Sequence, residues 1–302
     1  MTLALAGAAA DGAVIGHGQA LRVRLEPASG SAPGQRWTAF DEVYGEFPAP
    51  AQVRAYWKKS RTGAARHRDA GPEGDFATHA IVRALTHTFP GLELLPLSTQ
   101  RSMLMPCAAM LDSCAYPADH PHRTATHTFF VDDDHGLCLL REASPLVHEQ
   151  ISAGRRSFAL VTVNFRPDAG DQNLPVFRQL DVASVDDNSA LVSDFERAQL
   201  ELAPQFRDKV MQAAKLALPG LSLRVLPIDV PEAAPGSGFD LEANVKGTWV
   251  EFASGGMLSL AAMRAVGLVN HTHVLARGGH VSFGVERLAM VASGTLNIND
   301  VA

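Results

Sequence analysis

The stretch Ser282-Phe-Gly-Val-Glu-Arg-Leu-Ala-Met290 carries the most specific pattern in this chain of 302 residues. A strand-like end made of small residues leads into Gly284, and Glu286 and Arg287 then open an apolar pattern with helical spacing. The stretch therefore predicts a junction from a strand to a helix. An arginine in the first turn of a helix can also be an ordinary salt-bridged surface residue, so the role of Arg287 depends on the rest of the chain.

Before this junction, the chain alternates runs of strand-like segments with helices. Apolar and β-branched runs predict strands, and apolar residues three and four positions apart predict helices. In chain order, the sequence predicts a helix at 76–88, strands at 92–95, 126–131, 137–140, 158–165 and 176–185, a long helix at 194–218, strands at 221–226, 239–245 and 248–253, and a helix at 258–266. This order predicts an α+β fold, with a mostly antiparallel sheet of about six strands flanked by helices.

Composition sets limits on the class of protein. The chain has 26 Lys and Arg against 32 Asp and Glu, and 46% of its residues are hydrophobic, which excludes a mostly disordered chain. No apolar run reaches the ~18 residues that a membrane span needs, so we expect no membrane association. The apolar N-terminus lacks a basic segment before it, and the three cysteines form no CxxC pair, so we expect a cytoplasmic protein.

The first 70 residues differ from the rest of the chain. They are rich in Gly, Ala, Ser and Pro, and the segment 53–68 carries six Lys or Arg and no acidic residue. That basic run is either a phosphate-binding or partner surface, or a solvated helix face, and solvated faces are the more frequent case. A Gly- and Pro-containing stretch at 66–74 predicts a boundary. We therefore expect an N-terminal extension of unclear role at 1–70 and one catalytic domain at 71–302.

A second segment, Asn164-Phe-Arg-Pro-Asp168, is followed by a polar loop and by Phe177-Arg-Gln-Leu-Asp181. It reads as two antiparallel strands, with Arg166 at the end of one and Phe177 at the start of the next. An arginine can hold a phosphate oxygen through its forked donors, and a phenylalanine can stack on a base, so a nucleotide site is one interpretation. An ordinary hairpin with a surface arginine is the other.

Histidines are concentrated in two places that invite a metal-site interpretation, His120, His122 and His127 in one and His271 and His273 in the other. Their spacings match no zinc pattern, and no Cys or Glu stands nearby at a ligand spacing. Histidines in loops are the favoured interpretation.

Taken together, the segments resemble the catalytic core of class II aminoacyl-tRNA synthetases. The closest resemblance is to the phenylalanyl-tRNA synthetase α chain, and pyrrolysyl- and phosphoseryl-tRNA synthetases are more distant. The resemblance runs from about residue 76 to 301, and five motifs keep the order and similar spacing of the family. It is carried by Pro96 of motif 1, by Tyr116-Pro-Ala-Asp-His-Pro-His-Arg123, by Arg166 of motif 2 together with Phe177-Arg-Gln-Leu-Asp181, by Trp249-Val-Glu-Phe-Ala-Ser-Gly-Gly-Met257, and by Gly284-Val-Glu-Arg-Leu-Ala-Met290 of motif 3.

The resemblance implies a role for each matching residue. Arg166 and Arg287 would be the catalytic residues, Arg166 on the ATP α-phosphate and Arg287 over the adenine and near the γ-phosphate. Phe177 would cover the other face of the adenine, and Glu251 would place ATP and Mg²⁺. The implied amino-acid site comprises Ser144, Gln179, Asp181 and Gly256 together with five positions that depart from the family, Glu142, Leu226, Ile228, Ser254 and Ser282.

Those departures suggest a changed amino-acid substrate. Glu142 stands where the family has a histidine in "THTSP", and Leu226-Pro-Ile228 is the expected counterpart of "FPF", whose rings cradle the substrate. Ser254 and Ser282 replace the first glycines of the two glycine motifs. Because the implied ATP-binding positions are kept while the implied amino-acid positions change, we expect a working enzyme with a substrate other than phenylalanine.

The resemblance therefore leads to three functional hypotheses. The favoured one is an aminoacyl-adenylate-forming ligase, which uses ATP and Mg²⁺ and transfers the acyl group to a carrier protein or a small amine. An authentic phenylalanyl-like synthetase that charges tRNA is the first alternative, and a non-catalytic amino-acid or nucleotide sensor is the second. Three features argue against binding along a whole tRNA. The net charge is −6, the chain has only five lysines, and it shows no coiled-coil pattern of apolar heptads. We expect a homodimer.

Overall fold

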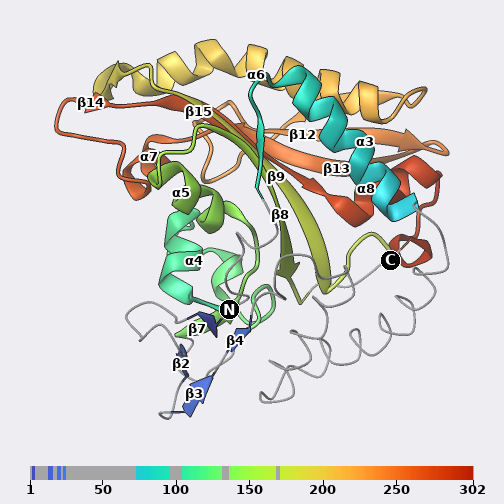
Figure 1. Ribbon diagram of the computed structural model, residues 1–302, viewed down its shortest axis with the longest axis horizontal. Coiled ribbons are helices and arrows are strands. Elements are labelled where there is room, and N and C mark those ends of the chain that lie inside the picture. Colours follow the sequence, from blue (N-terminus) through green and yellow to red (C-terminus); the bar gives the residue numbers. More distant parts are fainter. Residues whose placement is uncertain are drawn as a thin grey trace.

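The computed structural model describes residues 73–95, 104–130, 136–167 and 171–301, together with four short strands near the N-terminus (Figure 1). Those strands pair in twos: β1 (Thr2–Leu3) with β4 (Val23–Arg24), and β2 (Ala13–Ile15) with β3 (Gln19–Leu21). The basic run at 53–68 and Pro96 lie outside the described residues. The domain boundary near residue 70 therefore stays a prediction.

A seven-stranded sheet forms the centre of the fold, in the order β11-β12-β13-β15-β9-β8-β5. All neighbouring strands are antiparallel except β5 and β8, which are parallel. The strands are β5 (Glu93–Leu94), β8 (Ser157–Phe165), β9 (Val176–Asp186), β11 (Leu223–Pro227), β12 (Phe239–Val245), β13 (Thr248–Met257) and β15 (Arg277–Gly284). The predicted α+β fold with a mostly antiparallel sheet is confirmed.

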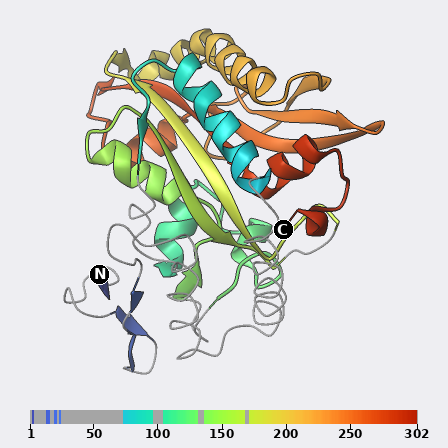
Figure 2. The same ribbon diagram turned by 45° about the vertical axis from the view of Figure 1, so that its right-hand side comes forward.

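Helices cover both faces of this sheet. On one face, α3 (Glu73–Thr88), α6 (Phe195–Ala217) and α8 (Val285–Ser293) pack together, as Figure 2 shows. On the other, α5 (Ser144–Ser152) and α7 (Leu260–Ala265) form a second apolar core with the sheet. Successive strand residues point to opposite faces, so Ala159 of β8 joins the first core and Phe158 joins the second. Burial on both faces explains the almost continuous apolar sequence of β8.

The remaining elements are short. They are β6 (Leu104–Pro106), α4 (Cys107–Ser113), η3 (Pro121–Arg123), β7 (Leu137–Leu139), β10 (Ala190–Leu191), η4 (Val192–Asp194), β14 (His273–Val274) and η5 (Ile298–Asp300). Helices α4 and α5 were not predicted, because seven and nine residues give little periodicity and neither N-cap side chain makes a capping hydrogen bond. The N-terminal part of the domain is thus less regular than its C-terminal part.

The predicted strand at 126–131 is wrong over its described part. The backbone amides of His127 and Thr128 both donate to the carbonyl of Thr124, and only Phe130 forms an isolated bridge, to Cys138. The hydroxyl of Thr124 also bonds that of Thr126. Local hydrogen bonds of threonine compete with a strand ladder, so this β-branched run folds into turns.

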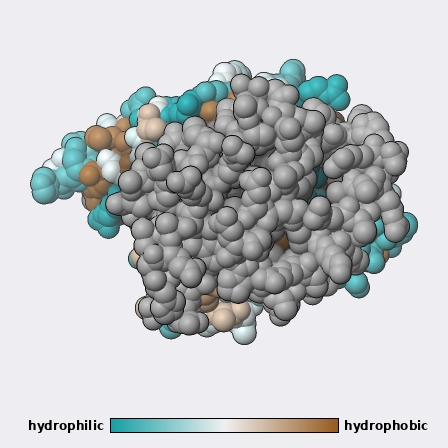
Figure 3. All heavy atoms as spheres, turned by 60° about the horizontal axis from the view of Figure 1, so that its bottom comes forward, coloured by the Kyte–Doolittle hydropathy of each residue, from teal (hydrophilic) through white to brown (hydrophobic). Residues whose placement is uncertain are grey.

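The large apolar side chains that are exposed are far apart in the sequence, and single exposed residues of this kind need no special explanation. Among the described residues they are Leu94, Leu191, Leu200, Leu216, Leu226 and Leu275. In Figure 3, the described residues along the rim of the face that it shows mix hydrophilic and hydrophobic colours. The expected homodimer stays a prediction. None of the helices in the described part of the chain combines the length and the apolar character needed to cross a membrane.

Candidate active site

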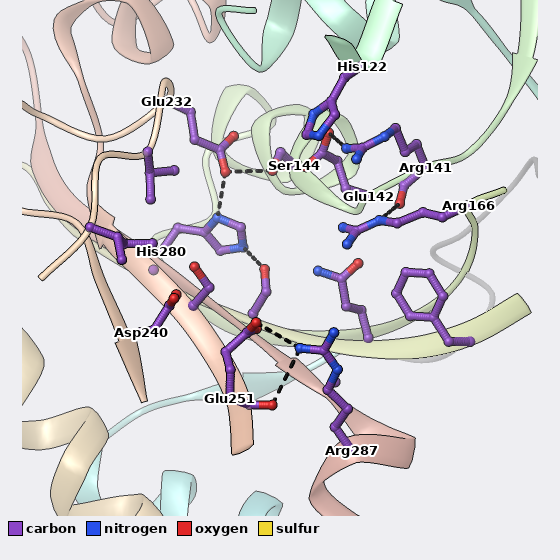
Figure 4. Close-up of a pocket in the computed structure, with 18 of the residues that line it drawn as sticks. His122, Arg141, Glu142, Ser144, Arg166, Glu232, Asp240, Glu251, His280 and Arg287 are labelled. Carbon is purple, nitrogen blue, oxygen red and sulfur yellow. Dashed lines mark hydrogen bonds and ion pairs between the residues drawn. The ribbon is translucent and has the colours of Figure 1, made fainter. Parts of the chain in front are cut away.

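A pocket of about 430 Å³ opens where β9, β13 and β15 meet the segments 116–144 and 228–233 (Figure 4). It contains every residue predicted for ATP binding, and most of those predicted for the amino acid. The predicted residues that line it are Arg166, Phe177, Glu251, Arg287, Glu142, Ser144, Gln179, Ile228, Ser254, Gly256 and Ser282. The topology therefore brings together side chains that are more than 100 positions apart in the sequence.

Arg166 and Phe177 lie at the loop end of the hairpin that β8 and β9 form. The register pairs Phe177 with Asn164, so Arg166 follows directly after β8 and faces the start of β9. Its guanidinium carbon lies 5.0 Å from the centroid of the Phe177 ring, and its Nε donates to the carbonyl of Arg141 at 3.3 Å. The charge is thus fixed over an aromatic face at the pocket wall.

Arg287, in the first turn of α8 at the same edge of the sheet, is held by contacts from two other segments. Its Nη1 lies 2.8 Å from Oε2 of Glu251 in β13, and its Nε and Nη2 donate to the Gln172 carbonyl and to Oδ1 of Asn173. The neighbouring Glu286 accepts from both the amide and Nε of Arg178, at 2.9 and 2.8 Å. Glu286 therefore ties the start of α8 to β9 and holds Arg287 at the pocket.

Two carboxylates of the pocket, one of them paired with Arg287, fit a magnesium ion. Glu251 and Asp240 both line the pocket, on the paired strands β13 and β12. Burial raises the pKa of Asp240 to about 6, with repulsion from Glu251 and Glu242 adding to it. A hard cation that prefers carboxylate oxygens would relieve that repulsion. The donor set present is therefore compatible with Mg²⁺ bound beside a polyphosphate.

Glu142 lies at the pocket wall as a buried, fully engaged carboxylate. It accepts from Nη1 of Arg141 at 3.1 Å and from the hydroxyl of Tyr116 at 3.0 Å. Burial alone would raise its pKa, but the nearby charges of Arg141 and Arg166 outweigh burial and lower it. Glu142 thus stays ionised.

A hydrogen-bonded network lies beneath the pocket floor. Asp181 is fully buried and does not line the pocket, contrary to the expectation of direct contact with the substrate. Its Oδ1 accepts from the Ser282 hydroxyl at 2.5 Å and lies 2.9 Å from Nε2 of His280. Burial opposes the imidazolium, but the hydrogen bond to Asp181 and the surrounding carboxylates outweigh it and raise the pKa of His280. Asp181 therefore holds the side chains of Ser282 and His280 beneath the pocket floor.

Sequence reasoning missed Glu232, which lies on the pocket wall next to this network. Its Oε1 accepts from the hydroxyl of Ser144 at 2.9 Å and lies 3.9 Å from Nδ1 of His280. Burial is the main reason that its pKa rises to about 7, and the charges of Glu142 and Asp181 add to the shift. A carboxylate with so high a pKa in a pocket is a candidate ligand-binding group.

Of the two residues expected to contact the substrate side chain on the wall of Glu232, only one lines the pocket. Leu226 is 41% exposed at the end of β11 and is not part of the pocket lining, whereas Ile228, Val230 and Glu232 are. Val230-Pro-Glu232 has the same residue–proline–residue spacing as the expected "FPF" element. That spacing was the signal that could have identified Glu232.

Small residues and an amide complete the floor. Ser254 and Ser282 are opposite each other on paired strands, and Gln179 accepts from Nδ2 of Asn164 at 2.8 Å. A Cβ on Gly256 would come within 2.8 Å of the Cβ of Ala233. The absence of a side chain at Gly256 therefore lets the 228–233 wall approach the sheet closely.

The histidines of the first group pack as an aromatic cluster with Tyr116. The Tyr116 and His120 rings stack at 4.4 Å, and the His122 ring meets Tyr116 edge-on at 4.7 Å. Burial and the charge of Arg141 lower the pKa of His122 to about 3, so it stays neutral. Within the described ranges, no group of three His, Cys, Asp or Glu side chains is placed to hold a metal ion.

The raised pKa of Glu232 predicts a pH-dependent stability. A carboxyl whose folded pKa is about 7 and whose usual value is near 4.5 binds its proton more tightly in the folded state. Its stabilising effect is complete below pH 4.5 and is lost as the pH rises through 7. Glu232→Gln should therefore gain stability relative to the wild type between pH 5 and 8, by about 1–3 kcal/mol.

Urea unfolding of both proteins across that pH range measures the difference. Glu201→Gln, which changes an exposed carboxylate on α6, is the matched control and should show no trend with pH. A difference between Glu232→Gln and the wild type that stays constant from pH 5 to 8 would contradict the raised pKa.

Comparisons with known proteins place the chain in a family. Residues 108–302 match the family described as tRNA synthetases class II core domain (F). The phenylalanine–tRNA ligase alpha subunit of Teredinibacter turnerae is 27% identical over 193 residues, which are 63% of this chain and 53% of that protein. The mitochondrial phenylalanine–tRNA ligase of Rattus norvegicus is 27% identical over 231 residues, 67% of this chain and 47% of that protein. The chain thus spans about half the length of these curated relatives.

Among solved structures, the chain is similar in fold to PylSc, a pyrrolysyl tRNA synthetase of Desulfitobacterium hafniense. The TM-score is 0.53 at 16% sequence identity, and the match covers 90% of this chain and 85% of that one. A second structure of the pyrrolysyl-tRNA synthetase from that organism gives a TM-score of 0.51 at 18% identity, with the same coverage.

Proposed function

The chain belongs to the class II tRNA synthetase core domain family, and from this we propose that it activates an amino acid with ATP, forming an aminoacyl-adenylate and pyrophosphate. One observation carries the proposal. Arg166 and Arg287 line a single pocket at the same edge of the sheet, Glu251 forms an ion pair with Arg287, and Asp240 lines the pocket from the strand that pairs with the strand of Glu251. Two fixed cations next to two candidate magnesium ligands form a site suited to a polyphosphate.

The proposed reaction needs charge stabilisation more than a base. The amino-acid carboxylate attacks the α-phosphorus, a new P–O bond forms, and the bond to pyrophosphate breaks. Arg166 would hold the α-phosphate oxygens as charge builds, while Arg287 would hold the leaving pyrophosphate end of ATP. A bound Mg²⁺ would neutralise polyphosphate charge next to Glu251. Because the attacking carboxylate is already ionised, no side chain has to remove a proton.

The amino group of the substrate would bind on the acidic side of the same pocket. Gln179 lines the pocket while its Oε1 accepts from Asn164, and Glu142 supplies an ionised carboxylate at the wall. We propose that these two residues hold the α-ammonium group. Asp181 would act through Ser282 and His280, whose side chains it holds.

We propose a carrier protein or a small amine as the acyl acceptor. The chain is net acidic and has five lysines, whereas binding along a tRNA needs many phosphate contacts from a basic surface. The names of the relatives favour the alternative, a ligase that charges tRNA. A non-catalytic sensor is less well supported, because a sensor needs no pair of arginines placed for a reacting polyphosphate.

ATP–pyrophosphate exchange tests the activation step. The purified chain should catalyse exchange with its preferred amino acid in the absence of tRNA. Total tRNA should bind only at the non-specific level of roughly 10⁻⁴–10⁻⁶ M at physiological salt, measured by filter binding. Stable charging of one defined tRNA by this chain alone would establish the alternative. If none of the amino acids tested supports exchange, the proposed activation is refuted.

A further inference from the structure

The pocket wall opposite Arg166 and Arg287 carries Glu232, one of whose carboxylate oxygens accepts no hydrogen bond from the described residues. Glu232 lines the pocket, and its side chain is only 16% exposed. Oε1 is engaged by Ser144, but Oε2 is buried and accepts no hydrogen bond from the described residues. Buried polar atoms in folded proteins are almost always hydrogen-bonded, so an atom of this kind in a pocket points to a donor on the ligand.

The charges around Glu232 indicate what kind of donor fits. Glu142 has Arg141 as its partner, and His280 lies 2.9 Å from Asp181 but 3.9 Å from Glu232. At most one positive charge, that of His280, therefore faces the two carboxylates of Asp181 and Glu232, so positive groups are too few at this end of the pocket. Burial also raises the pKa of Glu232, as expected of a carboxylate with too little positive charge nearby. A cation completes this arrangement better than a neutral group.

The position of Glu232 separates it from the proposed reaction centre. In Figure 4, Glu232 and His280 lie on one side of the pocket, and Arg166 and Arg287 lie on the other. A substrate whose carboxylate reaches the arginines would extend its side chain toward Glu232. Ile228 and Val230 flank that path on the same wall and can contact the apolar stem of a long side chain.

We propose that Glu232 is the specificity-determining residue of the pocket, and that the amino acid it selects carries a cationic nitrogen at the end of its side chain. The substrate class is thus basic amino acids with an amine or a guanidinium group. This inference rests on the proposed activation of an amino acid at the same site. An apolar side chain would leave Oε2 of Glu232 buried without a hydrogen-bond donor, which disfavours aliphatic and aromatic substrates.

Matched pairs of amino acids test the proposal in the exchange assay. Lysine is compared with norleucine, which lacks only the amine, and arginine with citrulline, which keeps the shape but not the charge. Ornithine tests a shorter stem. The best basic amino acid should exceed its neutral counterpart by at least 100-fold in kcat/KM. Equal activity within a pair, or a best substrate with a neutral side chain, would overturn the proposal and leave the activation function intact.

Variants of Glu232 give the second part of the test. Glu232→Gln keeps the size and removes the charge, and should reduce the preference for the basic partner at least tenfold, mainly through KM. Glu232→Asp keeps the charge and should retain the preference. Glu201→Gln, on the exposed face of α6, should behave as the wild type. An unchanged preference in Glu232→Gln would show that another group selects the side chain.

Calorimetry without ATP separates this proposal from the proposed function. The wild type should bind the basic amino acid more tightly than its neutral counterpart, and Glu232→Gln should lose that difference. Selective binding without any exchange would refute activation but support the pocket assignment. Exchange without selective binding or selective activation would support activation and refute the role of Glu232. Circular dichroism of each variant establishes that the fold is retained.

Discussion

Replacing Arg166 or Arg287 with alanine should lower ATP–pyrophosphate exchange by at least about 10- to 150-fold, with the fold intact. Each guanidinium would make charge-assisted contacts to ATP, and one such contact contributes roughly 1.5–3 kcal/mol. Both side chains line the pocket with their charges fixed, Arg166 over the ring of Phe177 and Arg287 beside Glu251. Losing the charge would leave the developing negative charge on the phosphates uncompensated.

Arg197→Ala is the matched control for both variants. Arg197 lies on α6 with 68% of its side chain exposed, and pairs with Asp194 and Glu201 on the surface. Its removal deletes one arginine and its ion pairs without touching the pocket, so exchange should remain at the wild-type rate. Initial exchange rates at saturating amino acid and varied ATP measure the effect. Wild-type exchange in Arg166→Ala or Arg287→Ala would remove that residue from the site.

Replacing Asp181 with alanine should lower the free energy of unfolding by about 3–5 kcal/mol. The carboxylate is fully buried, and its Oδ1 lies within hydrogen-bonding distance of both His280 and Ser282. Without it, the charge of His280 is left buried with only the more distant Glu232 as a partner. Breaking a buried pair by removing one member costs far more than breaking one at the surface.

Asp187→Ala supplies the comparison, because Asp187 is also paired but is 73% exposed. Its ion pair with Arg156 should contribute no more than about 1 kcal/mol. Urea unfolding followed by circular dichroism measures both variants. If Asp181→Ala were as stable as Asp187→Ala, the network beneath the floor would have no structural role, and direct substrate contact by Asp181 would become the better account of its position.

The strands of the sheet could be predicted because buried strands have continuous or alternating apolar residues in the sequence. β8 and β12 are apolar or alternating runs, and their predicted limits agree with the structure to within one residue. Prediction from apolar patterns failed where the apolar residues belong to a short helix or to an irregular segment. α4 packs Met110 and Leu111 into a small core of its own, within only seven residues. The run at 126–131 has strand-like residues but folds into turns.

The residues of the pocket likewise divide into those that the sequence predicted and those that it did not. Arg166 and Arg287 belong to local motifs, so their neighbours in the sequence identified them. Glu232 lies in a loop, and its proximity to His280 arises from chain segments nearly 50 residues apart, which no local pattern reports.

The register of β9 and β15 explains the unexpected position of Asp181. Gln179 is paired with Gly284 and remains at the pocket surface, whereas Asp181 is paired with Ser282, whose side chain bonds it. Gln179 and Asp181 lie on the same face of β9, but only Gln179 reaches the pocket, because Gly284 opposite it has no side chain whereas Ser282 covers Asp181.

The pairing of β9 with β15 also governs when the site can form during synthesis. Residues 277–284 complete the sheet against residues 179–186, about 100 positions earlier, and they bring His280 and Ser282 with them. A nascent chain that ends before β15 has Arg166 but neither the floor of the pocket nor Arg287. Contacts of such long range form late, since loop closure must precede them. A chain without β15 and Arg287 therefore lacks part of this pocket, and on the proposed function it could not form an adenylate.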